Sequence, residues 1–267
     1  SAAYALVAYQ TAWLKAHHPA AFMAATLSSE MADTDKVQLF WNDCLQNRIA
    51  FLPPDINRSG YRFSPVDDRT IRYGLGAIKG TGEAAIGAIV RARDAGGDFA
   101  DLFDFCRRID KRVVNRRVIE ALVRAGAFDA LDDHRHRLLA SVGPALEAAE
   151  QAERNALQGG LFDAPGEAGA AGMRPPEVPR WSERERLLHE KQALGFFLSG
   201  HPFNEFRAEI AAFARRPLAA IEAAKEPAIL AGVVLATRTQ MTRRGKMIFV
   251  VLDDGTAQQE VAVFNEV

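Results

Sequence analysis

The sequence predicts a mainly α-helical chain that ends in the first strands of a small antiparallel β-barrel. Three observations support this fold class. Apolar residues recur at helical spacing through most of the first 216 residues, and a glycine-rich hairpin interrupts them near residue 80. After residue 226 the pattern changes to three alternating runs, which is typical of strands. Three strands do not close a five-stranded barrel, so we expect the β-region to be incomplete.

Composition and charge are those of an ordinary globular protein. Of the 267 residues, 48% are apolar and 25% are charged, and the formal net charge is −1. No global field therefore attracts the chain to nucleic acid or to a membrane, and no apolar run is long enough to cross a bilayer. Cys44 and Cys106 fall in apolar helical patterns and are interpreted as reduced core thiols. Nucleic-acid binding would have to come from local patches.

Residues 1–73 are predicted to form a helical scaffold without chemistry. Helices are expected over 4–18 and 20–30, and Asp33 is a good N-cap for a third helix. Helical spacing relates Leu6, Tyr9, Trp13 and Leu14 in the first helix and predicts one buried stripe of Val37, Phe40, Trp41, Cys44 and Leu45 in the third. A short β-hairpin is expected at 61–74.

The stretch IKGTGEAAIGAI, residues 78–89, predicts the turn of a helix–hairpin–helix element. Ile78, Gly80 and Gly82 match the pattern h-x-G-x-G, and Ala85 is small where two helices must pack closely. The stretch is not a dinucleotide-binding fingerprint, because Ala85 occupies the position of the third glycine.

The same hairpin predicts a binding site for DNA phosphates. Gly80 and Gly82 are able to adopt positive φ and to expose N–H groups beside a helix N-terminus, where an anion is favoured. Lys79 adds positive charge, and Thr81, between the glycines, completes the candidate site. Glu83 counts against it, since a carboxylate repels phosphate. A glycine turn that serves only packing is the alternative.

A basic run follows at 107–124. Its seven cations (Arg107, Arg108, Lys111, Arg112, Arg116, Arg117 and Arg124) stand against Asp110 and Glu120, which gives a local charge of +5. The candidate DNA contacts in this run are Lys111, Arg112, Asn115, Arg116 and Arg117. Asn115 is also the expected N-cap of a helix that ends at Gly126. A solvated charged helix face is the alternative.

Residues 158–180 are predicted to be a flexible linker, because Gly and Pro supply 9 of these 23 residues. A helix is expected before the linker, over about 138–157, and another at 204–216. Directly after the linker, Ser182 and Glu185 match a capping box. The linker begins with QGGLFD, which places a leucine beside a phenylalanine where no core forms.

The remaining motifs are weak. His134 and His136 form an isolated H-x-H without further ligands at metal spacing, so a surface basic segment is predicted. The pairs Asp67–Asp68 and Asp253–Asp254 are interpreted as turn acids and not as a two-metal site. No nucleophile motif predicts covalent catalysis.

Six stretches together resemble the alpha subunit of bacterial replicative DNA polymerase III, the DnaE family. They are SAAYALVAYQTAWLKAHHPAAFMAA, LPPDINRSGYRF, IRYGLGAIKGTGEAAIGAI, DLFDFCRR, VNRRVIEALVRAGAFDAL and ERERLLHEKQALGFFLSGHPF. They run from one end of the chain to the other, so the resemblance covers nearly all of it.

The resemblance implies a domain order. It comprises the C-terminal part of the polymerase fingers (1–73), a tandem helix–hairpin–helix DNA-binding element (74–131), a helix (132–157), the linker with a clamp-binding motif (158–180), a helical connector (181–225) and the start of an oligonucleotide-binding (OB) barrel (226–267). Both ends of the chain fall inside predicted elements, so we expect a fragment of a longer protein.

The longer protein implied by the resemblance is a DNA-directed DNA polymerase, a nucleotidyltransferase that synthesises DNA in the 5′-to-3′ direction. This segment would contribute sequence-independent duplex binding and tethering to the sliding clamp. The carboxylates that hold magnesium in this family lie upstream, in the palm, so this chain is expected to be inactive alone and to hold no cofactor. The implied partners are primer–template DNA, the sliding clamp (beta subunit) and other holoenzyme subunits, in the bacterial cytoplasm at the nucleoid and without a membrane.

The family's clamp-binding pentapeptide begins with Gln and ends in an apolar–Phe pair. Gln158, Leu161 and Phe162 match it, although both middle positions here are glycine. The alternative is that the apolar pair folds back onto the preceding helix. On the first turn of the barrel, Arg243, Arg244 and Lys246 are candidate contacts for a single template strand.

Other functions are open from the sequence. One is a stand-alone helix–hairpin–helix module that binds DNA and carries a clamp peptide, and another is a purely structural helical adaptor. A third is a fragment of an error-prone DnaE-like polymerase. That group is expected to lack the internal clamp motif and the LGFFLSGHP segment, both present here, so the replicative form is favoured.

Overall fold

The computed structural model describes residues 2–158, 176–222, 226–242 and 245–264. Contacts between residues divide the chain into two compact units, Ser1–Leu198 (unit 1) and Ser199–Val267 (unit 2). The division falls inside the stretch 181–225, which the sequence predicts as one helical connector. In the described part of the chain, no helix is both long and apolar enough to cross a membrane.

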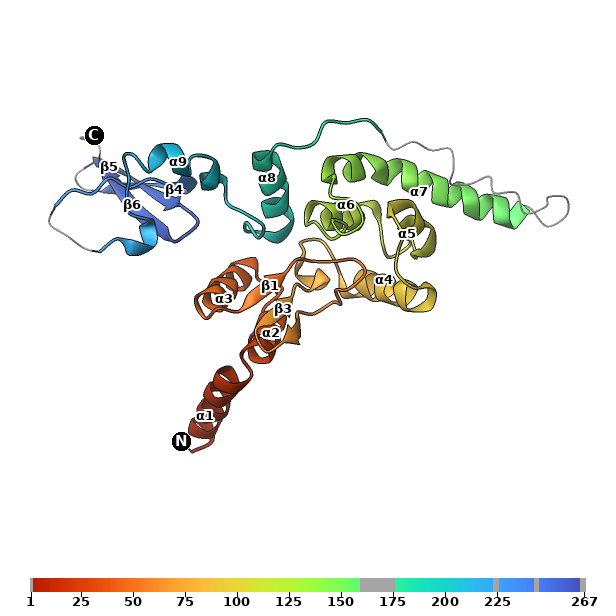
Figure 1. The fold of residues 1–267 in the computed structure, drawn as a ribbon, viewed down its shortest axis with the longest axis horizontal. Helices are drawn as coiled ribbons and strands as arrows, with labels where there is room; N and C mark the ends of the chain where they lie inside the picture. The colour runs from red at the N-terminus through yellow and green to blue at the C-terminus, as the bar shows by residue number, and fades with distance from the viewer. Residues whose placement is uncertain (1, 159–175, 223–225, 243–244, 265–267) are drawn as a thin grey trace. The chain divides into compact units, whose positions relative to one another are not determined.

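Unit 1 begins with three helices, α1 (Ala2–His17), α2 (Pro19–Ser29) and α3 (Thr34–Gln46), as Figure 1 shows. Pro19 opens α2 at a position where its missing N–H removes no helical hydrogen bond. Asp33 caps α3, because its carboxylate accepts hydrogen bonds from the amides of Asp35 and Lys36 at 3.1 and 3.2 Å. The three predicted helices are confirmed.

Helical spacing predicts burial only where another element covers the helix. The members of the α3 stripe in or against the core are Val37, Cys44, Phe40 and Trp41. Leu45 is 46% exposed, so its predicted place in the buried stripe is wrong. It lies in the last turn of α3, where Cys44 and not Leu45 is buried. None of the described residues of α1 is buried, although the helix itself was predicted from their apolar spacing.

A small sheet follows, made of β1 (Ala50–Leu52), β2 (Ser64–Asp67) and β3 (Thr70–Arg72). Its strand order is β1-β3-β2, with β1 parallel and β2 antiparallel to β3. The predicted hairpin at 61–74 is therefore confirmed. Tyr73, directly after β3, is fully buried and meets Phe63 edge to face, with ring centroids 4.8 Å apart.

The rest of unit 1 is helical: η1 (Leu75–Ala77), α4 (Glu83–Gly96), α5 (Leu102–Arg108), α6 (Arg116–Arg124), α7 (Arg135–Gln158) and α8 (Glu183–Leu194). Two helix–hairpin–helix elements, η1 with α4 and α5 with α6, share one core. The rings of Phe99, Phe105 and Phe128 interlock edge to face in that core, with centroids 5.0 and 5.1 Å apart. The predicted capping box opens α8, since Ser182 and Glu185 bond each other's backbone N–H.

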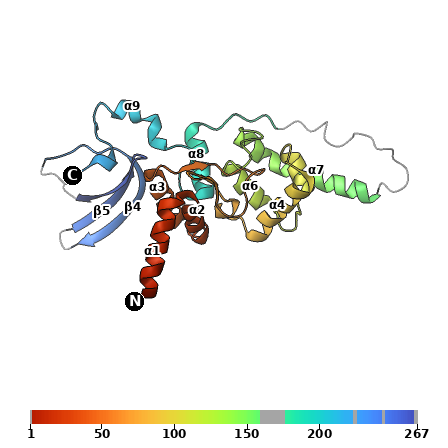
Figure 2. The same ribbon diagram turned by 60° about the horizontal axis from the view of Figure 1, so that its bottom comes forward.

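Unit 2 contains η2 (Pro202–Glu205), α9 (Arg207–Ile210), η3 (Leu218–Ala220), β4 (Val233–Thr242), β5 (Gly245–Asp253) and β6 (Gln258–Phe264). The strands form one antiparallel sheet in the order β4-β5-β6, with a bulge between Val234 and Ala236 (Figures 1 and 2). The three predicted strands are confirmed. The mainly α fold class followed by β-strands is correct.

The predicted helix at 204–216 is wrong. The segment forms a 3₁₀ turn and the four-residue helix α9, which ends at Ile210. Phe206 and Phe213 are 42% and 73% exposed, so the segment buries no continuous apolar face. A short helix without such a face gains too little from packing to extend.

In unit 2, the carboxylate of Asp253 joins three segments. It accepts hydrogen bonds from the amide of Gly255 at 2.8 Å and from the side chain of Gln258 at 2.9 Å, and it lies 3.2 Å from Nε2 of His201. Burial acts to raise the pKa of Asp253, but the hydrogen bonds outweigh burial and hold the pKa below its ordinary value. Asp253 thus contributes stability that is complete above the ordinary carboxyl pKa and is lost as the pH falls through the lowered one.

We expect Asp253→Asn to speed hydrogen exchange of the β5 and β6 amides at neutral pH by about tenfold, because the charged acceptor is lost. Below about pH 4, the wild-type chain should lose protection while the variant does not, so that the two converge. Hydrogen exchange corrected for the intrinsic rate at each pH measures this. A constant difference between the two chains from pH 3 to pH 7 would contradict the prediction.

Candidate nucleic-acid interface

The first hairpin connects η1 to α4 through residues 78–82. Ile78 is buried and anchors the turn, and Gly80 has φ +84°, a conformation that favours glycine. The hydroxyl of Thr81 donates to the carbonyl oxygens of Leu75 and Ile78, both at 2.7 Å. Thr81, predicted as a DNA contact, therefore uses its hydroxyl to close the turn, and the backbone of the glycines forms the outer surface.

The N-terminus of α4 carries no side-chain cap, because its N-cap residue is Gly82. By contrast, the side chains of Asp101, Asn115 and Ser182 cap α5, α6 and α8. The amides of the first turn of α4 point away from the helix, at the positive end of its dipole. Nothing lies within 4 Å of where a Cβ on Gly80 or Gly82 would stand, so an anion is able to approach closely.

Lys79 lies at the edge of this hairpin. Its backbone N–H donates to the carbonyl of Ala193 at the end of α8, at 2.8 Å, so a helix more than 100 residues away in sequence fixes the turn. The Lys79 side chain is exposed, and no ion pair holds it among the described residues. Its ammonium group is therefore available to a ligand of the hairpin. Glu83, which begins α4, is also exposed.

The basic run is largely neutralised within the chain. The ion pairs are Arg107 and Arg108 with Asp104, Lys111 with Glu153, Arg112 with Asp110, and Arg116 and Arg124 with Glu120. The predicted local charge of +5 did not include Asp104 and Glu153, which lie outside the run. Arg117 is exposed and has no ion pair among the described residues.

Several of these cations are structural. Arg108 donates to the carbonyls of Ala92 at 2.9 Å and Gly97 at 2.6 Å, and its guanidinium lies 4.4 Å from the ring centroid of Phe99. It therefore closes the connection between α4 and α5. Lys111 is mostly buried, with its ammonium 2.7 Å from Glu153 of α7, so it holds the second hairpin on α7.

The predicted contacts of the second hairpin thus fall into two groups. Lys111 and Asn115 already have partners within the chain: Lys111 pairs with Glu153, and the exposed Asn115 accepts a hydrogen bond from the amide of Val118 at 3.2 Å. Arg112, Arg116 and Arg117 project into solvent; the side chains of the first two are 89% and 64% exposed. These arginines are the ones that a nucleic acid could reach.

The other predicted site residues are placed only in part. Gln158 is the last residue of α7, while Leu161 and Phe162 of the clamp motif lie outside the described residues. Arg243 and Arg244 also lie outside them, and Lys246 is an exposed residue of β5.

A buried ion-pair network next to the hairpins was not predicted. The guanidinium of Arg135 donates to Asp129 at 2.6 and 2.8 Å and to Glu190 of α8 at 3.3 Å, and Arg135 and Glu190 are both almost fully buried. Burial by itself lowers the pKa of Arg135, but the two carboxylates outweigh burial and hold the pKa above its ordinary value. The arginine is therefore charged. Glu190 also accepts the amide of Leu198 at 2.7 Å. The one local signal was Gly126, whose φ is +83° and whose missing side chain leaves room for the guanidinium.

The prediction of a surface H-x-H segment is wrong for His134, which is buried. Its Nδ1 accepts a hydrogen bond from the amide of Arg137 at 3.1 Å, so the imidazole bonds a backbone N–H in the first turn of α7. His136 stacks on Trp181, with ring centroids 5.3 Å apart.

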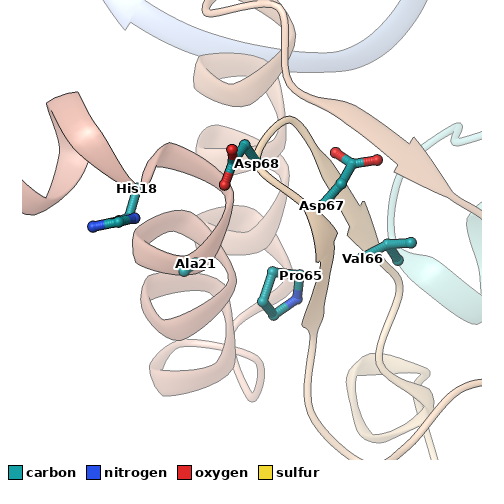
Figure 3. Close-up of a pocket in the computed structure, with 6 residues that line it drawn as sticks. All are labelled: His18, Ala21, Pro65, Val66, Asp67 and Asp68. Carbon is teal, nitrogen blue, oxygen red and sulfur yellow. The ribbon is translucent and has the colours of Figure 1, made fainter.

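A shallow cavity of about 250 Å³ lies between the start of α2 and the β2–β3 turn (Figure 3). His18 and Asp67 lie at opposite sides of it, and Asp67 accepts the amide of Arg69 at 2.8 Å, which makes it a turn acid as predicted. Nowhere among the described residues do three or more His, Cys, Asp or Glu side chains gather as metal ligands would.

Comparison with known proteins agrees with this geometry. Residues 48–138 match the helix-hairpin-helix motif family, a span that includes both hairpins. The chain is 51% identical over 263 residues to the DNA polymerase III subunit alpha of Neisseria meningitidis serogroup A, which covers 98% of this chain and 23% of that protein. The proteins of the same name from Vibrio cholerae and Escherichia coli are 44% and 42% identical, and each match covers 100% of this chain and 24% of the relative.

The chain spans about a quarter of the length of these relatives. The similarity is not confined to the hairpins, since it extends through the three N-terminal helices and the C-terminal strands. The chain therefore belongs to the family of DNA polymerase III alpha subunits, of which it corresponds to one helix–hairpin–helix-containing segment.

Proposed function

We propose that this segment binds primer–template duplex DNA, without reading its sequence, on behalf of a DNA-directed DNA polymerase. The observation that carries the proposal is the first hairpin: an uncapped helix N-terminus, two glycines without side-chain cover, and an exposed lysine beside them. Backbone amides at such a place bind phosphate oxygens, and phosphate contacts position a duplex but carry no sequence information. The second hairpin adds the exposed Arg112, Arg116 and Arg117.

The wider role follows from the relatives, which are named polymerase subunits about four times as long as this chain. We infer that synthesis takes place in other parts of such a protein, where magnesium is held, and that this segment alone is inactive. In this proposal Gln158, Leu161 and Phe162 bind the sliding clamp, and Lys246 with Arg243 and Arg244 contacts the single template strand. Other holoenzyme subunits are further partners, and the complex works at the bacterial nucleoid in the cytoplasm.

The test of duplex binding is Gly82→Asp. The backbone of Gly82 is extended, with φ −97° and ψ 158°, which suits an N-cap aspartate. The new carboxylate would cap α4 and occupy the place of the phosphate. We expect the affinity for a mixed-sequence duplex to fall by at least about tenfold, while unit 1 gains a few tenths of a kcal/mol in stability.

Fluorescence anisotropy with a labelled duplex, at several salt concentrations, measures the affinity. The wild-type affinity should fall steeply with salt, because bound phosphates release counterions. Gly82→Ser is the control, since it caps the helix without a charge and should weaken binding less. Unchanged binding by Gly82→Asp would show that the hairpin is a packing turn.

A further inference from the structure

We propose that Asp110 is an internal competitor for DNA: its carboxylate holds the guanidinium of Arg112 in the free protein, and Arg112 exchanges this carboxylate for a phosphate when a duplex binds. The inference rests on the proposed duplex binding and adds to it a residue that limits the affinity.

The contact between the two residues is bidentate. Nε of Arg112 donates to Oδ1 of Asp110 at 2.9 Å, and Nη2 donates to Oδ2 at 2.8 Å. The backbone amide of Arg112 also donates to Oδ1, at 3.0 Å. A phosphate offers oxygens in the same paired arrangement, so it is able to replace the carboxylate without a change in the arginine's geometry.

The second hairpin presents this pair to solvent. Ile109 and Val114 are buried on either side, and Lys111 is held on α7 by Glu153. The side chain of Arg112 is 89% exposed and that of Asp110 is 39% exposed. The turn is therefore fixed, while its outermost ion pair is free to open.

The other pairs of the basic run are less free to exchange. Arg108 is tied to backbone carbonyls, and Lys111 is mostly buried. Glu120 is shared between Arg116 and Arg124, and its side chain is only 20% exposed. The Asp110–Arg112 pair combines high exposure with a single partner for each charge, and exposed pairs of this kind contribute little to stability.

The competition does not depend on pH in the ordinary range. The hydrogen bonds from Arg112, with a smaller contribution from Arg91 of α4, lower the pKa of Asp110 to about 2. Asp110 is therefore a carboxylate at every pH at which DNA binding is measured. It repels phosphate as well as occupying Arg112.

The experiment compares Asp110→Asn, Arg112→Ala and the double variant of the whole 267-residue chain. Binding to a fluorescein-labelled, mixed-sequence 20-base-pair duplex is followed by anisotropy in a potassium chloride series. We expect Asp110→Asn to tighten binding by about three- to tenfold and Arg112→Ala to weaken it by a similar factor. In the Arg112→Ala background, Asp110→Asn should tighten binding less than it does in the wild-type chain, because only the repulsion of phosphate by Asp110 is then relieved and no arginine is released.

Glu30→Gln is the matched control. Glu30 forms an equally close exposed pair with Lys36, at 2.7 Å, and its removal makes the same change in net charge away from the hairpins. It should leave duplex binding unchanged. Tryptophan fluorescence reports whether each variant is folded, since all three tryptophans lie in unit 1.

The outcomes separate the two proposals. If the wild-type chain binds no duplex at any salt concentration, the proposed function fails and the competition with it. If the wild-type chain binds but Asp110→Asn binds no more tightly, only the competition is overturned. An equal gain from Asp110→Asn in the presence of Arg112→Ala, or from Glu30→Gln, would also overturn it, since net charge alone would then explain the effect.

Discussion

Replacing Arg135 with methionine is expected to lower the free energy of unfolding of unit 1 by about 3–5 kcal/mol. The substitution leaves Glu190, which is 1% exposed, facing a thioether in place of a guanidinium. Arg186 lies 3.7 Å from Glu190 and compensates only in part, because its side chain is partly solvated. The loss arises mainly from the buried carboxylate.

Urea denaturation followed by tryptophan fluorescence measures this effect, because Trp13, Trp41 and Trp181 all belong to unit 1. The double variant Arg135→Met with Glu190→Gln tests the cause. Glutamine keeps an acceptor for the amide of Leu198 but removes the buried charge, so about 1–2 kcal/mol should return. If the double variant is less stable than Arg135→Met alone, the lost packing of Arg135 and not the charge explains the destabilisation.

The second large effect concerns the clamp motif. Leu161→Ala combined with Phe162→Ala, made in the full-length polymerase, is expected to abolish clamp binding and clamp-dependent processive synthesis. Burial of two such side chains is worth roughly 3–6 kcal/mol. Ordering the segment on binding costs several kcal/mol of this gain. The peptide alone should bind at about micromolar affinity at best, and tethering on DNA makes that sufficient.

Short extension without the clamp should survive in the same variant, because the proposed duplex contacts lie elsewhere. Met173→Ala is a matched control, since it removes an apolar side chain from the same linker outside the motif. Surface plasmon resonance on immobilised clamp and primer extension with and without clamp provide the two measurements. Equal loss of both activities would show that Leu161 and Phe162 serve the fold of the polymerase and not the clamp.

The sequence was most informative where structure depends on neighbouring residues. Asp33, Asn115 and Ser182 were recognised as N-caps, because a cap bonds amides within three residues of itself. Gly80 was recognised in the same way, since its positive φ belongs to the turn itself. The three C-terminal strands followed from the change of period and from the turns expected at Gly245 and Gly255.

Predictions failed or were incomplete where the partner lies far away in sequence. The local charge of the basic run did not reveal that Glu153 neutralises Lys111, and no pattern indicated that Glu190 would pair with Arg135. The predictions that Leu45 is buried and that a helix covers 204–216 failed for a related reason. Helical spacing identifies an apolar face but not whether another element covers that face.

By itself, the sequence determined the order of helices, hairpins and strands, the positions of the caps and turns, and the family to which the chain belongs. Only the tertiary structure decided which cations of the two hairpins are exposed: Lys79, Arg112, Arg116 and Arg117 face solvent, whereas Lys111 is used internally. The physical reason is that a backbone turn depends on local sterics and hydrogen bonds, while the charge that a surface presents depends on carboxylates that folding brings from distant helices.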